Sequence, residues 1–154
     1  MHDNFCWGCG PDNPDGLQLK SRWDGDDPTR SVAEWVPRPE HTAGTRDILN
    51  GGIIATLLDC HGVGTAIADT YRREARDFGS DPEVWCATAS MTVEYLRPAP
   101  VESVLGLRGR VVDVDGRFTT VECELLAAGK LRARATVRAV RVPDTWRFGP
   151  SGSG

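Results

Sequence analysis

The stretch from Asn50 to Ala75 reads NGGIIATLLDCHGVGTAIADTYRREA, and it determines how the rest of the chain must be arranged. In its first half, isoleucine, leucine and alanine recur at helical spacing and also fill the positions between, so almost every side is apolar. This pattern predicts a helix from near Gly51 to about Ala75 that is largely surrounded by protein. The arginines near its end suit the negative end of the helix dipole. Other elements of the chain must therefore cover this helix.

Strand patterns lie on both sides of the predicted helix. Before it, Leu17 to Trp23 and Ser31 to Val36 predict a hairpin with a turn between them. After it, alternating stretches separated by turn residues predict a four-stranded antiparallel meander: Trp85 to Tyr95, Val104 to Val114, Arg117 to Ala127 and Lys130 to Val142. The expected fold is therefore α+β, an antiparallel sheet of about six strands wrapped around one long central helix. Because free sheet edges often pair between subunits, we expect a homodimer or homotetramer.

Composition excludes several classes of protein. The 154 residues suit one domain, which we expect at 17–142, with an N-terminal lead-in at 1–16 and a C-terminal tail at 143–154. The net charge of −4 opposes nucleic-acid binding, and no apolar run is long enough to span a membrane. An odd number of cysteines and an N-terminus without signal-peptide features favour a reducing compartment. We expect a cytoplasmic protein that binds neither nucleic acid nor membrane.

Two features of the predicted helix carry possible chemistry. Asp59 lies in its apolar half, where a carboxylate is costly unless it is paired, hydrated or needed for function. The glycines at its start expose backbone N–H groups at the positive end of the helix dipole, where they can polarise a carbonyl oxygen or hold an anion. From these residues alone, a catalytic carboxylate and a satisfied structural acid both remain open.

Over residues 6–142 the chain resembles hotdog-fold thioesterases of the phenylacetate-degradation, PaaI-like type. The resemblance rests on CWGCGPDNPDGL at residues 6–17, on NGG at 50–52 followed by Asp59, and on YLRP at 95–98. It implies the hotdog fold and an acyl-CoA thioesterase, which hydrolyses an acyl-CoA substrate to a free carboxylic acid and CoA. No cofactor is expected, because the CoA ester is the substrate.

The resemblance also implies a role for each site residue. Backbone N–H groups near Gly51 or Gly52 would bind the thioester carbonyl, and Asp59, reaching a partner's substrate across a dimer interface, would be general base or nucleophile. Thr88 stands at the position of a Ser or Thr that helps to hold the water. Asn50 stands where the family commonly has histidine, and an amide orients other groups but does not titrate near neutral pH. If an acid is needed there, the chain is instead a non-catalytic acyl-CoA-binding protein.

Further residues are candidates for substrate binding or for packing. Arg97 and Arg117 lie beside predicted turns, where binding residues tend to be found, and arginine can bind the phosphates of CoA. His41 precedes the helix and could reach the cleft. Cys60 and His61 are neighbours on the helix and point in different directions, so they do not form a nucleophile–base pair with each other. We expect His61 to be packed and hydrogen-bonded, and a role in supporting a site residue is the alternative. A third possibility is a purely structural domain, which leaves the glycine-rich helix start unexplained. The fold alone would also permit a dehydratase, because a fold does not determine the reaction.

The five cysteines are candidate metal ligands. Cys6 and Cys9 have metal-ligand spacing, but a zinc site needs four ligands and no second pair has such spacing. The other cysteines fall in predicted helix or strand, where cysteine is usually a small apolar residue. They are Cys60, Cys86 and Cys123. We therefore expect no metal site.

Overall fold

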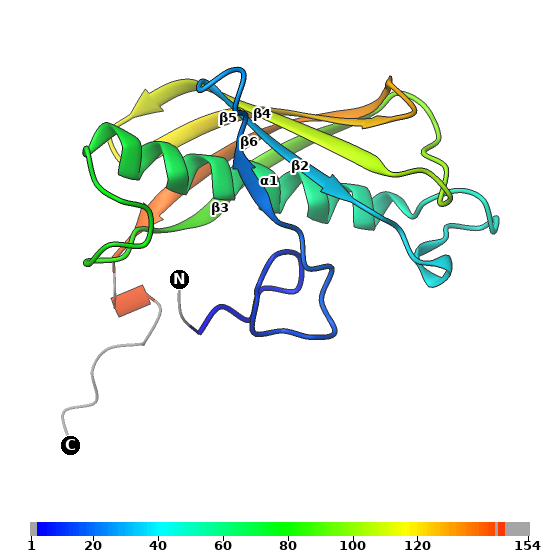
Figure 1. The fold of residues 1–154 in the computed structure, drawn as a ribbon, viewed down its shortest axis with the longest axis horizontal. Helices are drawn as coiled ribbons and strands as arrows, with labels where there is room; N and C mark the ends of the chain where they lie inside the picture. The colour runs from blue at the N-terminus through cyan, green and yellow to red at the C-terminus, as the bar shows by residue number, and fades with distance from the viewer. Residues whose placement is uncertain (1–2, 144, 147–154) are drawn as a thin grey trace.

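The computed structural model describes residues 3–143 and 145–146, so most of the expected C-terminal tail lies outside the described residues (Figure 1). Six strands form one antiparallel sheet in the order β1-β2-β4-β5-β6-β3, and the long helix α1 (Gly51–Arg73) packs across one face of it. The strands are β1 (Ser21–Trp23), β2 (Arg30–Trp35), β3 (Trp85–Tyr95), β4 (Leu105–Asp115), β5 (Phe118–Ala127) and β6 (Lys130–Val142). This architecture confirms the predicted hotdog fold.

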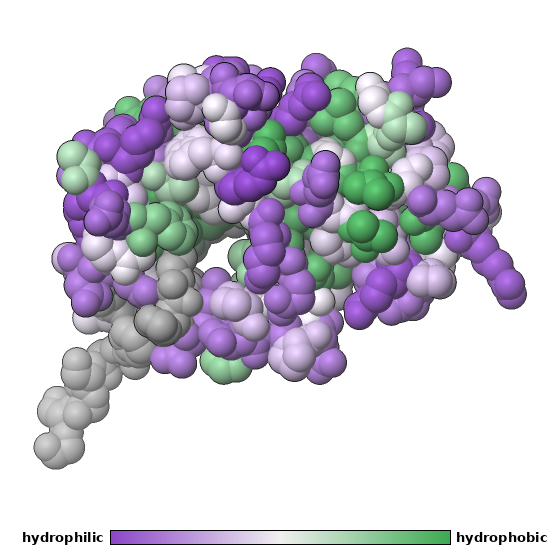
Figure 2. Space-filling model, in the orientation of Figure 1, coloured by the Kyte–Doolittle hydropathy of each residue, from purple (hydrophilic) through white to green (hydrophobic). Residues whose placement is uncertain are grey.

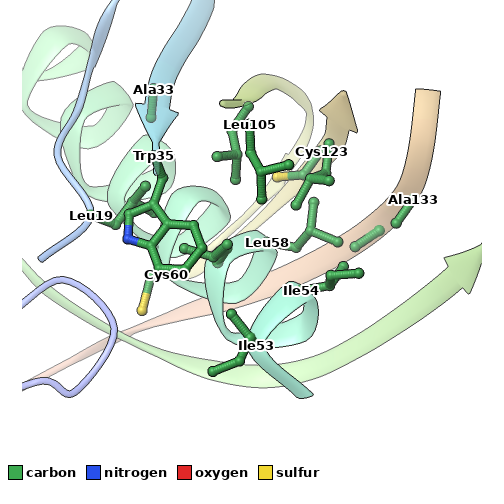
Figure 3. Close-up of a cluster of buried hydrophobic side chains, with 14 of the residues drawn as sticks. Leu19, Ala33, Trp35, Ile53, Ile54, Leu58, Cys60, Leu105, Cys123 and Ala133 are labelled. Carbon is green, nitrogen blue, oxygen red and sulfur yellow. The ribbon is translucent and has the colours of Figure 1, made fainter. Parts of the chain in front are cut away.

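The core lies between α1 and the middle of the sheet. Alternate residues of β5 and β6 face the helix and are buried, among them Val121, Cys123, Leu125, Ala133, Ala135 and Val137. Figure 3 shows Ile54 and Leu58 of α1 close to Leu105 and Cys123 of the sheet. By length and composition alone α1 could also cross a membrane, but its buried apolar side chains form this core.

Gly62 marks a close approach of α1 to the sheet. A Cβ atom at this position would lie 2.8 Å from the Cβ of Val137 on β6, which is too close for two carbon atoms. Gly64 differs, because the position of its missing Cβ is open space. The packing of the helix on the sheet therefore requires glycine at 62 and does not require it at 64.

The start of α1 is held by three hydrogen bonds. Asn50 is the N-cap, and its Oδ1 accepts a hydrogen bond from the Gly52 N–H at 2.7 Å. The backbone N–H of Asn50 donates to the carbonyl of His41 at 2.9 Å. Tyr95, at the end of β3, donates its hydroxyl proton to the carbonyl of Gly51 at 2.8 Å. Together these bonds fix the helix start against the preceding loop and against β3.

The edge strand β3 contains a bulge. It pairs with β6 on one side, and no strand of the described residues pairs with its other side. The pairing register shifts between Thr88 and Ser90, so Ala89 is an extra residue in the strand. Strict alternation would place Thr88 on the opposite face from Met91 and Val93. The bulge instead brings all three to the side of α1, because an inserted residue reverses the alternation.

The first strand is shorter than predicted. The strand expected from Leu17 to Trp23 begins only at Ser21. The backbone N–H groups of Leu17 and Leu19 donate instead to carbonyl groups of the N-terminal segment, residues 3–16, and Gln18 has a φ of 55° that interrupts an extended backbone. Both leucines are buried all the same. The N-terminal segment is thus bonded to the body of the domain.

Two substitutions in α1 test the close approach at Gly62. We expect Gly62→Ala to lower the free energy of unfolding by about 1–2 kcal/mol, because overpacking costs about 1–3 kcal/mol and helix propensity returns at most about 1 kcal/mol. Gly64→Ala is the matched control and should raise the free energy of unfolding by about 0.5–1 kcal/mol. Urea unfolding followed by circular dichroism measures both. Equal effects of the two substitutions would contradict the close approach.

The N-cap at Asn50 gives a second prediction. Asn50→Ala removes the acceptor for the Gly52 N–H and should lower the free energy of unfolding by about 1 kcal/mol. Asn50→Asp keeps a side-chain oxygen at the same place and should stay close to the wild type. The same urea unfolding experiment serves for both variants. If Asp and Ala were equally destabilising at this position, the capping bond would not stabilise the helix.

Candidate functional site

Asp59 and Thr88 are brought together by α1 and β3. Asp59 lies near the middle of the helix with its side chain half-buried, and its Oδ1 accepts a hydrogen bond from the Thr88 hydroxyl at 2.6 Å. Burial raises the pKa of the Asp59 carboxyl, and the hydrogen bond from Thr88 opposes this shift. The bulge at Ala89 makes the contact possible, because it turns Thr88 toward the helix. A carboxylate and a hydroxyl so placed can orient a water molecule between them and a substrate.

A cavity of about 840 Å³ opens beside Asp59, and we call it the Asp59 cavity. Its walls come from α1, the start of β3, the β1 region and the N-terminal segment, and they are mostly apolar, with Trp23, Phe78 and Trp85 among them. Figure 2 shows a hollow between the N-terminal segment and the body of the molecule. An apolar cavity of this size with a few polar groups is typical of sites that bind small organic molecules.

A second, smaller cavity of about 320 Å³ lies at the start of α1. Gly51, Tyr95 and Arg97 line it, so two predicted substrate-binding residues, Gly51 and Arg97, share one cavity. Asp59 and Thr88 are not among its lining residues, and the rise of an α-helix separates Gly51 from Asp59 by about 12 Å along the axis. One subunit therefore brings the predicted residues together in two pairs, Asp59 with Thr88 and Gly51 with Arg97.

The two predicted carbonyl-binding N–H groups differ in their present partners. Gly52 donates its N–H to the Asn50 side chain, so a ligand bound there would have to displace that amide oxygen. In the described part of the chain the Gly51 N–H has no acceptor, as is usual for the first residue of a helix. The Gly51 N–H is thus the group that is free to donate a hydrogen bond to a carbonyl oxygen.

His41 does not line either cavity, contrary to the expectation that it could reach the cleft. Its ring is buried and stacks on Trp35, with the two ring centroids 5.1 Å apart. Its Nδ1 accepts a hydrogen bond from the backbone N–H of Arg38 at 3.0 Å. Among the described residues, His41 is linked to the helix start through its carbonyl, which accepts a hydrogen bond from the N–H of Asn50.

Arg117 also lines neither cavity. Its guanidinium lies over the ring of its neighbour Phe118, 5.6 Å from the ring centroid. Phe118 pairs with Val140 of β6, which pairs with Ala87 near the start of β3, whereas Arg97 follows the end of β3. The two predicted phosphate-binding arginines therefore lie at opposite ends of one subunit.

His61 is packed and hydrogen-bonded, which confirms the interpretation from the sequence. It is fully buried, with its Nδ1 2.8 Å from the Ser21 hydroxyl and its Nε2 3.1 Å from the Ser31 hydroxyl. Burial lowers its pKa to about 4, so the ring is neutral near neutral pH. His61 connects α1 to β1 and β2 and is a structural residue.

Sequence reasoning missed one cluster of side chains. The Sγ atoms of Cys6, Cys9 and Cys60 all lie within 4.8 Å of one another, and those of Cys6 and Cys60 are 3.6 Å apart. Cys60 was expected to be an ordinary small apolar residue, but Figure 3 shows its sulfur pointing away from the other labelled core side chains. The neighbouring Cys60 and Cys9 thiols lower the pKa of the Cys6 thiol. The spacing of Cys6 and Cys9 was the only signal of this cluster in the sequence.

Known proteins share both the sequence pattern and the fold. The family model described as thioesterase superfamily matches residues 47–133. A thioesterase superfamily protein from Shewanella loihica PV-4 is 35% identical, with a TM-score of 0.65 over 81% of this chain and 91% of that chain. No curated protein sequence matches the chain significantly.

Two more distant structures support the fold alone. The phenylacetic acid degradation-related protein of Ralstonia eutropha JMP134 is 21% identical, with a TM-score of 0.65 over 82% of this chain and 86% of that chain. The PaaI protein of the Escherichia coli phenylacetic acid degradation operon is 13% identical, with a TM-score of 0.64 over 82% of this chain and 81% of that chain.

The family match itself runs from the loop before α1 into β6 and includes Asp59 and Thr88. The match to the family model and the 35% identity to the Shewanella loihica protein show that the chain belongs to the thioesterase superfamily.

Proposed function

We propose that the protein is an acyl-CoA thioesterase, which hydrolyses an acyl-CoA to a free carboxylic acid and CoA. Membership of the superfamily supports thioester hydrolysis in general. The observation that carries the proposal is the Asp59 carboxylate, which is hydrogen-bonded to Thr88 at the wall of a large apolar cavity. A protein that only bound an anionic CoA ester would gain nothing from a half-buried carboxylate beside it.

In the proposed reaction Asp59 is the group that activates the attack on the thioester. As a general base it takes a proton from water while the water oxygen bonds to the carbonyl carbon, and Thr88 holds the water in place. As a nucleophile it forms an anhydride with the acyl group, which water then hydrolyses. On either route the C–S bond breaks, the CoA sulfur gains a proton, and a backbone N–H stabilises the charge on the carbonyl oxygen.

We propose that the carbonyl-binding N–H comes from a second subunit. Asp59 and Gly51 of one chain are about 12 Å apart along α1, too far for one thioester group to touch both. The outer edge of β3, with which no described strand pairs, offers a place for a second copy of the chain. If two β3 strands pair antiparallel, the start of one lies beside the end of the other. Thr88 and Asp59 then approach the partner's Tyr95 and the partner's Gly51.

The same pairing brings the predicted arginines to one end of a dimer. Arg117 lies toward the start of β3 and Arg97 follows its end, so antiparallel pairing puts Arg117 on the same side as the partner's Arg97. We propose that these arginines bind the phosphates of CoA, because a guanidinium binds phosphate oxygens in pairs. Within one subunit they could not share a ligand.

The first prediction for this function concerns Asp59. Asp59→Asn should lower kcat for acyl-CoA hydrolysis by about 100- to 10,000-fold, because an amide is neither a base nor a nucleophile. The fold should be retained, since asparagine is nearly isosteric. Free-thiol release is measured with short, long and aryl acyl-CoAs. The matched control is Asp113→Asn, which removes an exposed carboxylate on β4. Hydrolysis by Asp59→Asn at the wild-type rate would show that Asp59 is only a satisfied core acid.

The second prediction tests whether the site is shared between subunits. Asp59→Asn and Gly51→Val should each be inactive as homodimers, the latter because its side chain blocks the helix start. Coexpressed hybrids should regain activity, because one of their two sites has an intact Asp59 from one chain and an intact Gly51 from the other. Hybrids purified with two different tags are assayed by free-thiol release, after sedimentation has established that they are dimers. Inactive hybrids, or a monomeric wild type, would contradict the shared site.

A further inference from the structure

We infer that Cys6, Cys9 and Cys60 form a binding site for one zinc ion, which fastens the N-terminal segment to α1 at the wall of the Asp59 cavity. The site consists of three thiols from two segments of the chain, and it does not depend on the proposed reaction. The sequence expectation of no metal rested on too few ligands near Cys6 and Cys9. The fold supplies a third ligand from the middle of α1.

The distances between the sulfur atoms suit zinc. A tetrahedral zinc ion holds each thiolate sulfur at about 2.3 Å, which places two such sulfurs about 3.8 Å apart. Cys6 and Cys60 have their sulfurs 3.6 Å apart, and all three sulfurs lie within 4.8 Å of one another. Shifts of a few tenths of an ångström for these two sulfurs, and somewhat more for the third, would bring all three to one ion. Soft thiolate ligands select zinc over magnesium or calcium.

The loop that carries Cys6 and Cys9 is held in shape by hydrogen bonds. The Gly10 N–H donates to the Cys6 carbonyl at 2.8 Å and closes the turn. The Gln18 side chain donates to the Gly10 carbonyl at 2.8 Å and ties the turn to the domain. These two bonds hold the loop that carries Cys6 and Cys9 against the domain.

Cys60 is presented to this loop by a rigid element. It lies in the middle of α1, and the loop packs so tightly on it that a Cβ at Gly8 would lie 2.2 Å from the Cys60 sulfur. Gly8 is therefore needed for the three thiols to meet. Cys86 differs from Cys60 in that its sulfur belongs to no such group within the described residues.

Three protein ligands leave a fourth position on the ion. All three cysteines line the Asp59 cavity, so this position faces the cavity and is open to water. Cys6 is exposed, so an ion can reach the site without unfolding the domain. A bound ion would hold one wall of the cavity by linking residues 6–9 to α1.

The experiment uses the full chain, purified under reducing conditions, loaded with Zn²⁺ alone and dialysed before elemental analysis. We expect one zinc per chain and a rise in Tm on zinc binding. Cobalt substitution should give the thiolate-to-cobalt absorption bands of a tetrahedral site. Cys9→Ser, on the loop, and Cys60→Ser should each weaken zinc binding by about 100-fold or more, because each removes one thiolate ligand. Cys86→Ser, which removes a thiol outside the cluster, should bind zinc as the wild type does.

Several results would overturn the zinc site. One is a chain that retains no zinc after dialysis and gives no thiolate-to-cobalt bands. Another is unchanged zinc binding in Cys9→Ser, which would assign the ion to other ligands. Because Cys9 lies on the loop, this result holds whether or not Cys60→Ser folds. A third is a disulfide between Cys6 and Cys60 that forms to the same extent with and without zinc, because a bound ion would protect both thiolates from oxidation.

Discussion

The packing of α1 against β5 and β6 is the contact on which the other features depend. Gly62 lets the helix lie close to Val137, and this approach buries Leu57 and Leu58 completely. A helix held so closely cannot rotate or slide without opening the core, because protein interiors are close-packed. Asp59 therefore has a fixed position at the border between the core and the cavity, where the edge strand supplies its hydrogen-bond partner.

Much of this fold could be predicted from the sequence because its signals are local. Alternation predicts the bounds of β3 and β6 as the structure has them, and the apolar run from Gly51 predicts the helix. The hydrogen bonds of Leu17 and Leu19 to the N-terminal segment could not be predicted, because they join residues that no periodic pattern relates. Strict alternation also gives the wrong face for Thr88, because the bulge at Ala89 reverses the alternation.

The candidate site was predictable in its residues and less so in its geometry. The apolar helix singles out Asp59 and the resemblance adds Thr88, but their contact follows from a bulge that the sequence pattern does not predict. Gly51 and Asp59 lie on one helix at a fixed rise, so the proposed contact of one thioester with both requires two subunits. His41 and Cys60 have partners in distant segments of the fold, and these partners, not the local sequence, decide what each residue does.

The proposed mechanism depends most on where the thioester lies. A crystal structure of the protein with a thioether analogue of an acyl-CoA, in which a methylene group replaces the scissile carbonyl, tests this directly. We expect that methylene carbon beside the Asp59 carboxylate of one subunit and close to the Gly51 N–H of the other, with the acyl chain in the Asp59 cavity. An analogue whose methylene carbon lies away from Asp59, or which contacts the helix start and the carboxylate of the same subunit, would contradict the account.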